Sequence, residues 1–315
     1  MHPSEITVII PTMDRYDDLK LTLDSYAQGT DRPDQLVIVD QSRTDPQRIE
    51  TLARSYANCF RVDYLFQEKP SLTLARNQGF RLSENELLVY SDDDITVQPD
   101  TIANIRRWMQ DPELAMIGGL NLREKNATGK LGYLFCKKNW KKRHTGHVTV
   151  SMLGRFPELP LHGTCLTEWS MGFFYVVRKP LMERWGLRSD ENLIGYGYAE
   201  DLDFSFAYYR HAQAEGLRCI MSEDVQVDHR VSDVGRLPSR KAAMMFVINR
   251  TYLSYKHFPN RPSARAALSW SIFGDWMLWA SRRHHPENLA HAALVARRHR
   301  PELRQGILRP EWYQE

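Results

Sequence analysis

The stretch Leu87-Leu88-Val89-Tyr90-Ser91-Asp92-Asp93-Asp94 joins a short apolar run directly to three consecutive aspartates. An apolar run of this kind, rich in Leu and Val, is typical of a strand that is covered on both faces of a sheet. In open α/β sheets, ligands bind beyond the carboxyl ends of the strands. The stretch therefore predicts a buried strand with an acidic site at its carboxyl end.

Similar apolar runs occur three times earlier in the chain, at residues 6–10, 36–39 and 62–66. Apolar residues at helical spacing over 16–28 and 45–57 predict a helix between successive runs. Strands and helices in alternation predict an α/β fold, with a Rossmann-like, mostly parallel sheet flanked by helices.

The second half of the chain has a different pattern. Residues 121–165 are less regular, whereas 173–177 and 218–221 read as further strands on either side of a helix predicted over 200–215. From about residue 238 the pattern is wholly helical. The sequence therefore predicts an α/β domain over residues 1–237 and a helical carboxyl-terminal extension over 238–315.

Composition excludes several classes of protein. Lys and Arg number 42 against 39 Asp and Glu, and a net charge of +3 gives no bulk reason to expect a nucleic-acid partner. The four cysteines form no CxxC pair, so neither a zinc ribbon nor a disulfide framework is indicated, and a reducing compartment is expected. No apolar run reaches the roughly 18 residues that a membrane-spanning helix requires.

The three aspartates at 92–94 carry the first chemical signal. In a strand, residues two apart share a face, so Asp92 and Asp94 would point together while Asp93 points away. Two close carboxylates repel one another unless a proton or a cation intervenes. Mg²⁺ is typically held by one or two carboxylates together with substrate phosphates. The pattern indicates a divalent-metal site, and an acidic turn capping the next helix is the alternative.

Three further polar groups have both a chemical and a structural interpretation. Arg76 suits a phosphate, although a single Arg near a helix start is commonly a surface residue. Glu200 and Asp201 open a predicted helix, where the helix dipole alone favours acids; the alternative is a general base that removes a proton from a hydroxyl group. His229 could complete a metal site, although a single His is more often structural.

In order and spacing, these motifs resemble family 2 glycosyltransferases, which have the GT-A fold. The resemblance covers residues 5–230. The motifs that carry it are Ile9-Ile10-Pro11-Thr12, Val39-Asp40-Gln41-Ser42, Ala75-Arg76-Asn77-Gln78-Gly79, Asp92-Asp93-Asp94, Glu200-Asp201 and His229.

The resemblance implies a role for each site residue. Asp201 would be the catalytic base, and Glu200 would orient the acceptor beside it. Asp94, Asp92 and His229 would bind the metal. The implied nucleotide-binding residues are Pro11, Thr12, Arg15, Asp40, Ser42, Arg76, Asp92 and Asp93. The implied loop for the donor sugar and the acceptor is Trp169, Ser170, Met171 and Gly172.

The resemblance also implies an activity: a metal-dependent, inverting transfer of a sugar from a nucleoside-diphosphate sugar to an acceptor hydroxyl. The cation would be Mn²⁺ or Mg²⁺ and the nucleotide UDP. The acceptor would be a glycan or a lipid-linked glycan, as in cell-surface polysaccharide assembly. Residues 1–120 would form the nucleotide-binding half and 121–237 the acceptor half. Gln41 and residues 68–72 depart from the family pattern, which leaves the base and the donor contacts there unassigned.

Two segments leave a choice of interpretation open. The basic cluster over residues 137–144 is either a solvated loop or a contact for an acceptor or an anionic surface. Residues 264–300 carry Trp and apolar residues followed by Arg, which suits either a helix at a membrane interface or one packed on the catalytic domain. We expect a cytoplasmic protein, peripheral at the inner face of the cytoplasmic membrane under the first interpretation of 264–300.

Two other functions compete with the transferase. A sugar nucleotidylyltransferase also needs a nucleotide crevice, Mg²⁺ and Asp pairs, but the loop at residues 12–15 lacks the glycines that this class normally carries there. A non-catalytic nucleotide-sugar binding module is the other alternative, and the presence together of Asp92, Asp94, Asp201 and His229 argues against it. Neither GxxxxGK nor GxGxxG occurs in the chain.

Overall fold

The computed structural model describes residues 5–124, 131–195, 197–231, 239–282 and 284–315. Among these residues, nine strands form one mixed sheet in the order β3-β2-β1-β4-β10-β6-β11-β5, with β9 paired to β11. These strands are β1 (Ile6–Thr12), β2 (Gln35–Asp40), β3 (Arg61–Phe66), β4 (Leu87–Ser91), β5 (Ile95–Val97), β6 (Leu114–Asn121), β9 (Thr164–Leu166), β10 (Phe174–Arg178) and β11 (Arg218–His229). A separate ribbon consists of β7 (His147–Val148) and β8 (Gly154–Arg155).

Strands β3, β2, β1 and β4 run parallel to one another. Strand β10 is antiparallel to both β4 and β6, while β11 is parallel to β6 and antiparallel to β5. The carboxyl ends of β1, β2 and β4 therefore lie at one edge of the sheet, and the loops that follow them are neighbours.

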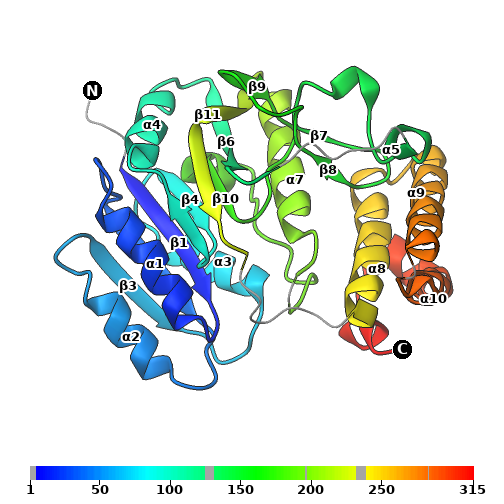
Figure 1. Cartoon of the computed structure of the whole chain (residues 1–315), viewed down its shortest axis with the longest axis horizontal. Helices are drawn as coiled ribbons and strands as arrows, with labels where there is room; N and C mark the ends of the chain where they lie inside the picture. The colour runs from blue at the N-terminus through cyan, green and yellow to red at the C-terminus, as the bar shows by residue number, and fades with distance from the viewer. Residues whose placement is uncertain (1–4, 125–130, 196, 232–238, 283) are drawn as a thin grey trace.

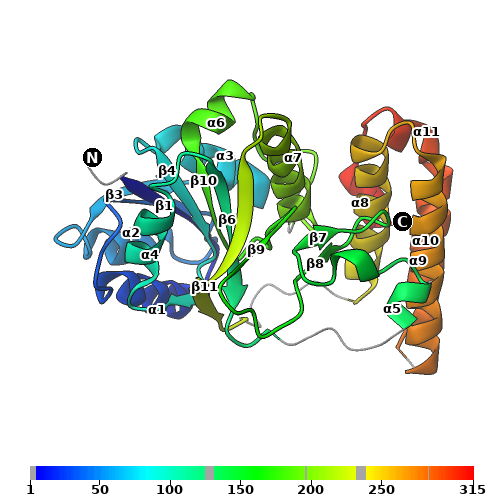
Figure 2. The same ribbon diagram turned by 90° about the horizontal axis from the view of Figure 1, so that it is seen from above.

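Helices cover both faces of this sheet. They are α1 (Tyr16–Ala27), α2 (Pro46–Arg54), α3 (Leu72–Leu82), α4 (Thr101–Trp108), α6 (Lys179–Arg184) and α7 (Glu200–Ala214). The short helix α5 (Leu131–Leu134) lies away from the sheet, beside the carboxyl-terminal helices (Figure 2), and the 3₁₀ turn η1 (Trp140–Lys142) follows it in the chain. Helices α1 and α4 lie on one face and α3, α6 and α7 on the other (Figure 2). Successive side chains of β1 point to opposite faces of the sheet and so enter two different hydrophobic cores. Val8 packs in the core that contains Leu19 of α1, and Ile9 packs in the core that contains Phe80 of α3.

The carboxyl-terminal part is helical and lies at the end of the molecule opposite β3 (Figure 1). It contains α8 (Ser239–His257), α9 (Pro262–Ser281), α10 (Pro286–Arg298), α11 (Arg300–Arg304) and the 3₁₀ turn η2 (Pro310–Tyr313). Ile248 of α8 and Val295 of α10 share a core with Trp169 and with Leu202 of α7. The extension is thus packed on the α/β part, and the predicted boundary at 237–238 falls at the edge of 232–238, outside the described residues.

The predicted α/β architecture is confirmed, with a parallel half, helices on both faces and a helical extension. Three details differ. Strand β3 is only partly buried, because it lies at the sheet edge and has a neighbour on one side alone. Strand β11 continues to His229 instead of ending at 221. Residues 92–94 lie in a turn between β4 and β5 instead of extending the strand.

Candidate active site

The turn at residues 92–94 holds the first cluster of candidate residues. Ligand-type atoms of Asp92, Asp94 and His229 all lie within 4.8 Å of one another. Strand pairing explains this, because β11 is antiparallel to β5 and His229 is opposite Ile95, which follows Asp94 directly. The predicted grouping of Asp92 with Asp94 is therefore present, although a turn produces it and not the alternation of a strand.

His229 is held in place by several contacts. Its Nε2 lies 3.2 Å from Asp94 Oδ1, and its ring stacks on Phe173 with centroids 5.0 Å apart. Its backbone N–H donates to Asn121 Oδ1 at 3.2 Å. Burial lowers the pKa of His229, but the hydrogen bond to Asp94 and the charges of Asp92 and Asp94 outweigh it, so the pKa lies above its ordinary value.

The donor set fits a divalent cation. Burial raises the pKa of Asp92 to about 7, with the neighbouring Asp94 charge adding to the effect and Arg76 opposing it. Two carboxylates held this close together repel one another, and a cation between them removes that repulsion. Carboxylate oxygens suit Mg²⁺ and Mn²⁺, and an imidazole can accompany them.

Asp93 faces the other way. Its carboxylate accepts hydrogen bonds from Thr12 Oγ1 at 2.6 Å and from Arg15 Nη1 at 2.9 Å. Arg15 also lies 3.5 Å from Asp94 Oδ2. Burial raises the pKa of Asp93 to about 6, and the Arg15 charge opposes this. These contacts join the ends of β1 and β4.

The end of β2 carries a second predicted set. Asp40 is fully buried; its Oδ1 accepts the Ser42 N–H at 2.8 Å and its Oδ2 accepts the Tyr64 hydroxyl at 2.8 Å. Ser42 Oγ in turn accepts the Asp14 N–H at 2.8 Å. With Pro11 and Thr12 on β1, these residues occupy the adjoining strand ends where a nucleotide is predicted to bind. Their nucleotide contacts stay a prediction.

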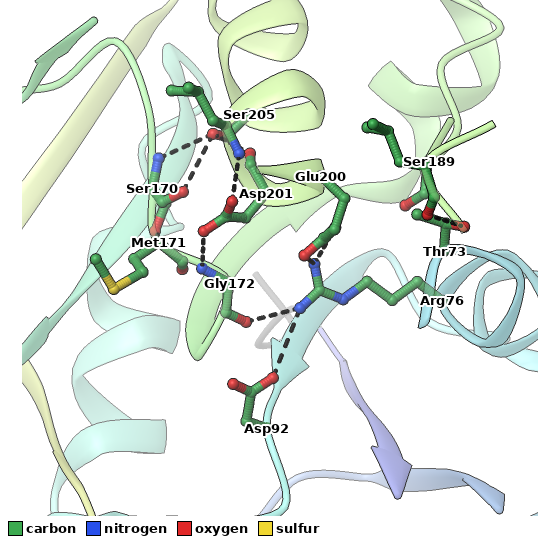
Figure 3. Close-up of polar contacts among 12 residues, drawn as sticks. Thr73, Arg76, Asp92, Ser170, Met171, Gly172, Ser189, Glu200, Asp201 and Ser205 are labelled. Carbon is green, nitrogen blue, oxygen red and sulfur yellow. Dashed lines mark hydrogen bonds and ion pairs between the residues drawn. The ribbon is translucent and has the colours of Figure 1, made fainter. Parts of the chain in front are cut away.

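Arg76 connects Asp92 of the candidate metal cluster with Glu200, the neighbour of the predicted base Asp201 (Figure 3). It lies on α3 with a side chain only 2% exposed. Its Nη1 donates to both carboxylate oxygens of Glu200 at 2.5 Å. Its Nη2 donates to Gly172 O at 2.9 Å and lies 3.6 Å from Asp92 Oδ1. In this arrangement the guanidinium holds protein groups, and the nucleotide contact predicted for Arg76 stays untested.

Glu200 and Asp201 begin α7, where Glu200 is buried and Asp201 is partly exposed. Burial raises the pKa of Glu200 to about 8, although the charge of Arg76 opposes the shift. Burial also raises the pKa of Asp201, again against the charge of Arg76. Asp201 Oδ2 accepts the Gly172 N–H and Oδ1 accepts the Leu202 N–H, each at 2.8 Å. A carboxylate fixed in this way and raised in pKa suits proton abstraction.

The loop at residues 169–172 lies against both acids. Trp169 is buried, and its Nε1–H donates to Arg155 O at 2.9 Å, while the Ser170 N–H donates to Ser205 Oγ at 3.0 Å. A Cβ at Gly172 would lie 2.9 Å from Arg76 Nη2 and 3.1 Å from Asp201 Cβ. A larger residue at this position would have to displace Arg76 or Asp201, and the backbone groups of Gly172 bind these same two residues. Met171 packs at the rim of two cores.

Some residues that shape the site are not predicted from the sequence. Phe173 and Asn121 fix His229 but belong to no motif; the pairing of β11 with β6 brings Asn121 beside it, and Phe173 directly precedes β10 of the same sheet. Gly172 was predicted as part of a sugar loop, not as the residue that bonds to both Arg76 and Asp201. Its glycine in an otherwise bulky stretch is the one signal that could have indicated a close approach.

Comparison with known proteins shows which sequences and folds this chain resembles. Residues 7–150 match the model of a family described as glycosyl transferase family 2. Validoxylamine A glucosyltransferases from Streptomyces hygroscopicus subsp. limoneus and subsp. jinggangensis are each 32% identical over 108 residues. That region covers 33% of this chain and 23% and 25% of the two relatives, so the chain spans about a quarter of their length.

Three solved structures resemble the whole fold. A mannosyltransferase from Pyrobaculum calidifontis in complex with GDP-Man and Mn²⁺ has a TM-score of 0.55 at 17% identity, covering 100% of this chain and 83% of that one. The structure of S. aureus TarS 1–349 has a TM-score of 0.55 at 14% identity, and the match covers 93% of this chain and 91% of that one. The structure of GalNAc-T7 with UDP, GalNAc and Mn²⁺ has a TM-score of 0.57 at 15% identity, and the match covers 87% of this chain and 55% of that one. At these identities the likeness concerns the fold, and the predicted GT-A fold is confirmed.

Proposed function

We propose that this chain, a member of glycosyl transferase family 2 with the GT-A fold, transfers a sugar from a nucleoside-diphosphate sugar to an acceptor hydroxyl. One observation carries the proposal. A cluster suited to a cation, made of Asp92, Asp94 and His229, is joined through Arg76 to Glu200, the neighbour of the candidate base Asp201. Leaving-group stabilisation and proton removal are the two tasks that such a transfer requires, and both sets of groups lie at one sheet edge.

The candidate cation site supplies the first task. Asp92, Asp94 and His229 would hold Mn²⁺ or Mg²⁺, which when bound offsets negative charge on a departing diphosphate. Two of the solved structures with this fold contain Mn²⁺. Arg76 keeps Asp92 in position through its Nη2 group. Thr12 and Arg15 hold Asp93 on the other side of the turn, which fixes the turn itself.

Asp201 supplies the second task. The Gly172 N–H donates to its Oδ2, and a carboxylate oxygen can accept more than one hydrogen bond, so this oxygen retains capacity to accept the proton of an acceptor hydroxyl. Removal of that proton as the hydroxyl attacks the sugar from the face opposite the diphosphate gives a single displacement with inversion. Glu200 is tied to Arg76 by both carboxylate oxygens, which assigns it to positioning and leaves Asp201 as the base.

The finer assignments are also proposals. We assign residues up to 237 to catalysis, with nucleotide contacts at the ends of β1 and β2 and the acceptor bound near the loop at 169–172. UDP is the nucleotide that we propose to test first, since one solved relative in fold contains UDP and another GDP-Man. The acceptor is proposed to be a glycan or lipid-linked glycan used in polysaccharide assembly.

A thermal-shift panel tests the proposal. UDP, GDP and other nucleoside diphosphates are each added with and without Mn²⁺, and one of them should raise the melting temperature in the presence of the metal. A ligand at a hundredfold excess over its Kd stabilises the folded state by about 2.7 kcal/mol. Matched turnover assays should then release a nucleoside diphosphate. Release of pyrophosphate would identify a nucleotidylyltransferase, and absence of any nucleotide binding would remove the proposal.

A further inference from the structure

The outward side of helix α9 is unusual for a helix in contact with water. Trp270, Phe273, Trp276, Met277 and Leu278 are each 39–46% exposed. The helix carries only two charged residues, Arg265 and Asp275, and both are turned toward the protein. A surface helix normally presents its polar side to solvent. Here the exposed side is the apolar one.

The short segment that includes α5 and η1 extends this apolar surface. Leu131 is 65%, Leu134 59% and Trp140 61% exposed. The segment lies beside α9 in both views (Figures 1 and 2). The Trp270 Nε1–H donates to Leu134 O at 2.8 Å, and the Phe135 ring lies 5.3 Å from that of Trp270. We call this combined surface the α5–α9 face.

The α5–α9 face has a basic rim. Residues 131–144 contain five Lys or Arg and no acidic residue, although Lys137, Lys142 and Arg143 pair with Asp275, Glu168 and Glu158 from other parts of the chain. Arg143 lies 4.5 Å over the ring of Trp140, Lys138 lies 5.6 Å from that of Tyr133, and Lys141 is exposed. At the other end, Arg282 follows α9 and is exposed as well. Aromatic side chains and cations are thus placed together on one surface.

We propose that the α5–α9 face docks on an anionic phospholipid surface. Trp rings favour the boundary between apolar and aqueous phases, and Lys and Arg beside them meet lipid phosphates. None of the helices in the described ranges is both long and apolar enough to cross a bilayer, so the docking is peripheral. Helix α10 takes no part through its apolar side, since Leu289 and Val295 are buried in the core shared with α8.

A second copy of the chain is a poorer occupant of this face. A two-fold dimer places the same patch of both copies together. The basic rim of one copy, with Lys141 and Arg143, would then face the basic rim of the other, and like charges would oppose association. An anionic lipid surface instead offers phosphates to the Lys and Arg of the basic rim and an apolar boundary to the exposed aromatic side chains. This inference goes beyond the proposed sugar transfer and does not depend on it.

Vesicle flotation of the full chain tests the inference without donor or metal. Vesicles of phosphatidylglycerol and phosphatidylcholine in equal parts should carry the protein, while pure phosphatidylcholine should carry at least about tenfold less. Added salt should release it, because exposed charges are screened. Trp276→Ser/Met277→Ser should weaken binding at least about tenfold. The matched control is Leu21→Ser, a residue 51% exposed on α1 at the far end of the molecule.

Charge variants form the second arm. Lys141→Gln/Arg282→Gln should weaken binding about fivefold for each charge removed. Arg32→Gln/Arg81→Gln removes two exposed charges from the opposite part of the chain and should leave binding unchanged. Failure of the wild-type chain to float with anionic vesicles overturns the proposal, as does equal flotation of the α5–α9 variants. A dimer that Trp276→Ser/Met277→Ser dissociates, with no vesicle binding, would show that a second copy covers the face.

Discussion

Replacement of Arg76 by Met tests whether the buried guanidinium holds the site together. The variant retains most of the side-chain volume but leaves Glu200, which is 4% exposed, without its cation. Removal of one partner from a buried ion pair typically costs about 3–5 kcal/mol, because the remaining charge is buried and unpaired. Gly172 O and Asp92 lose their contacts with the same group.

The cost should depend on pH in a defined direction. Burial already raises the pKa of Glu200 to about 8 while Arg76 opposes the shift. Without Arg76 the pKa of Glu200 rises further, so above about pH 8 the variant keeps a proton that the wild type releases. The folded variant then binds more protons than the folded wild type. Its stability deficit therefore grows as the pH rises past 8, by up to about 1.4 kcal/mol per pH unit. The growth ends when the deficit reaches the cost of about 3–5 kcal/mol for an unpaired buried charge.

Urea unfolding in metal-free buffer, followed by tryptophan fluorescence, measures this deficit at about pH 6 and about pH 9. Glu200→Gln is the matched control. It has no carboxyl group at this position to release a proton, so its deficit should not grow with pH; the wild type alone loses stability as the pH rises toward 8, and the deficit of Glu200→Gln should therefore shrink between about pH 6 and about pH 9. The double variant Arg76→Met/Glu200→Gln should recover much of the loss at high pH. An Arg76→Met deficit that is equal at both pH values, or below about 1 kcal/mol, would refute the reasoning.

Three other predictions follow from the site. Asp201→Asn should keep the nucleotide-induced thermal shift but lower kcat at least about 10²-fold, and full transfer by this variant would remove Asp201 from the role of base. Asp94→Asn should weaken Mn²⁺ binding at least about tenfold in calorimetric titration, because Asp94 belongs to the candidate cation site. Asp93→Asn should not weaken it, because the Asp93 side chain points to Arg15 instead. Gly172→Ala should destabilise the chain by about 1–3 kcal/mol in urea unfolding and reduce transfer, because its Cβ would crowd Asp201; an unchanged midpoint and rate would contradict the crowding.

The site was predictable from the sequence wherever it depends on a strand end. Asp40 and the 92–94 run directly follow apolar runs, and such runs indicate buried strands whose carboxyl ends share an edge. The family resemblance added Glu200, Asp201 and His229 as candidates. Their roles in binding and catalysis stay predictions.

Other features depended on contacts between distant parts of the chain. Packing of α3 turns the Arg76 side chain toward Glu200, 124 residues further along, and the nucleotide contact predicted for Arg76 stays a prediction. The two interpretations of residues 264–300 could not be separated either, because helical periodicity does not show which neighbour covers an apolar side. In the structure the apolar side of α10 is buried against α8, whereas α9 has exposed Trp and apolar side chains, and contact with a membrane stays a prediction.

The sequence by itself determined the alternation of strands and helices and the placing of acids at strand ends, because both depend on side-chain periodicity over a few residues. Tertiary structure alone decided that Asp94 meets His229 and that Arg76 meets Glu200. The first contact depends on the register of β11 against β5, and the second on how α3 packs beside α7. Each results from burial across the whole core, which no local pattern encodes.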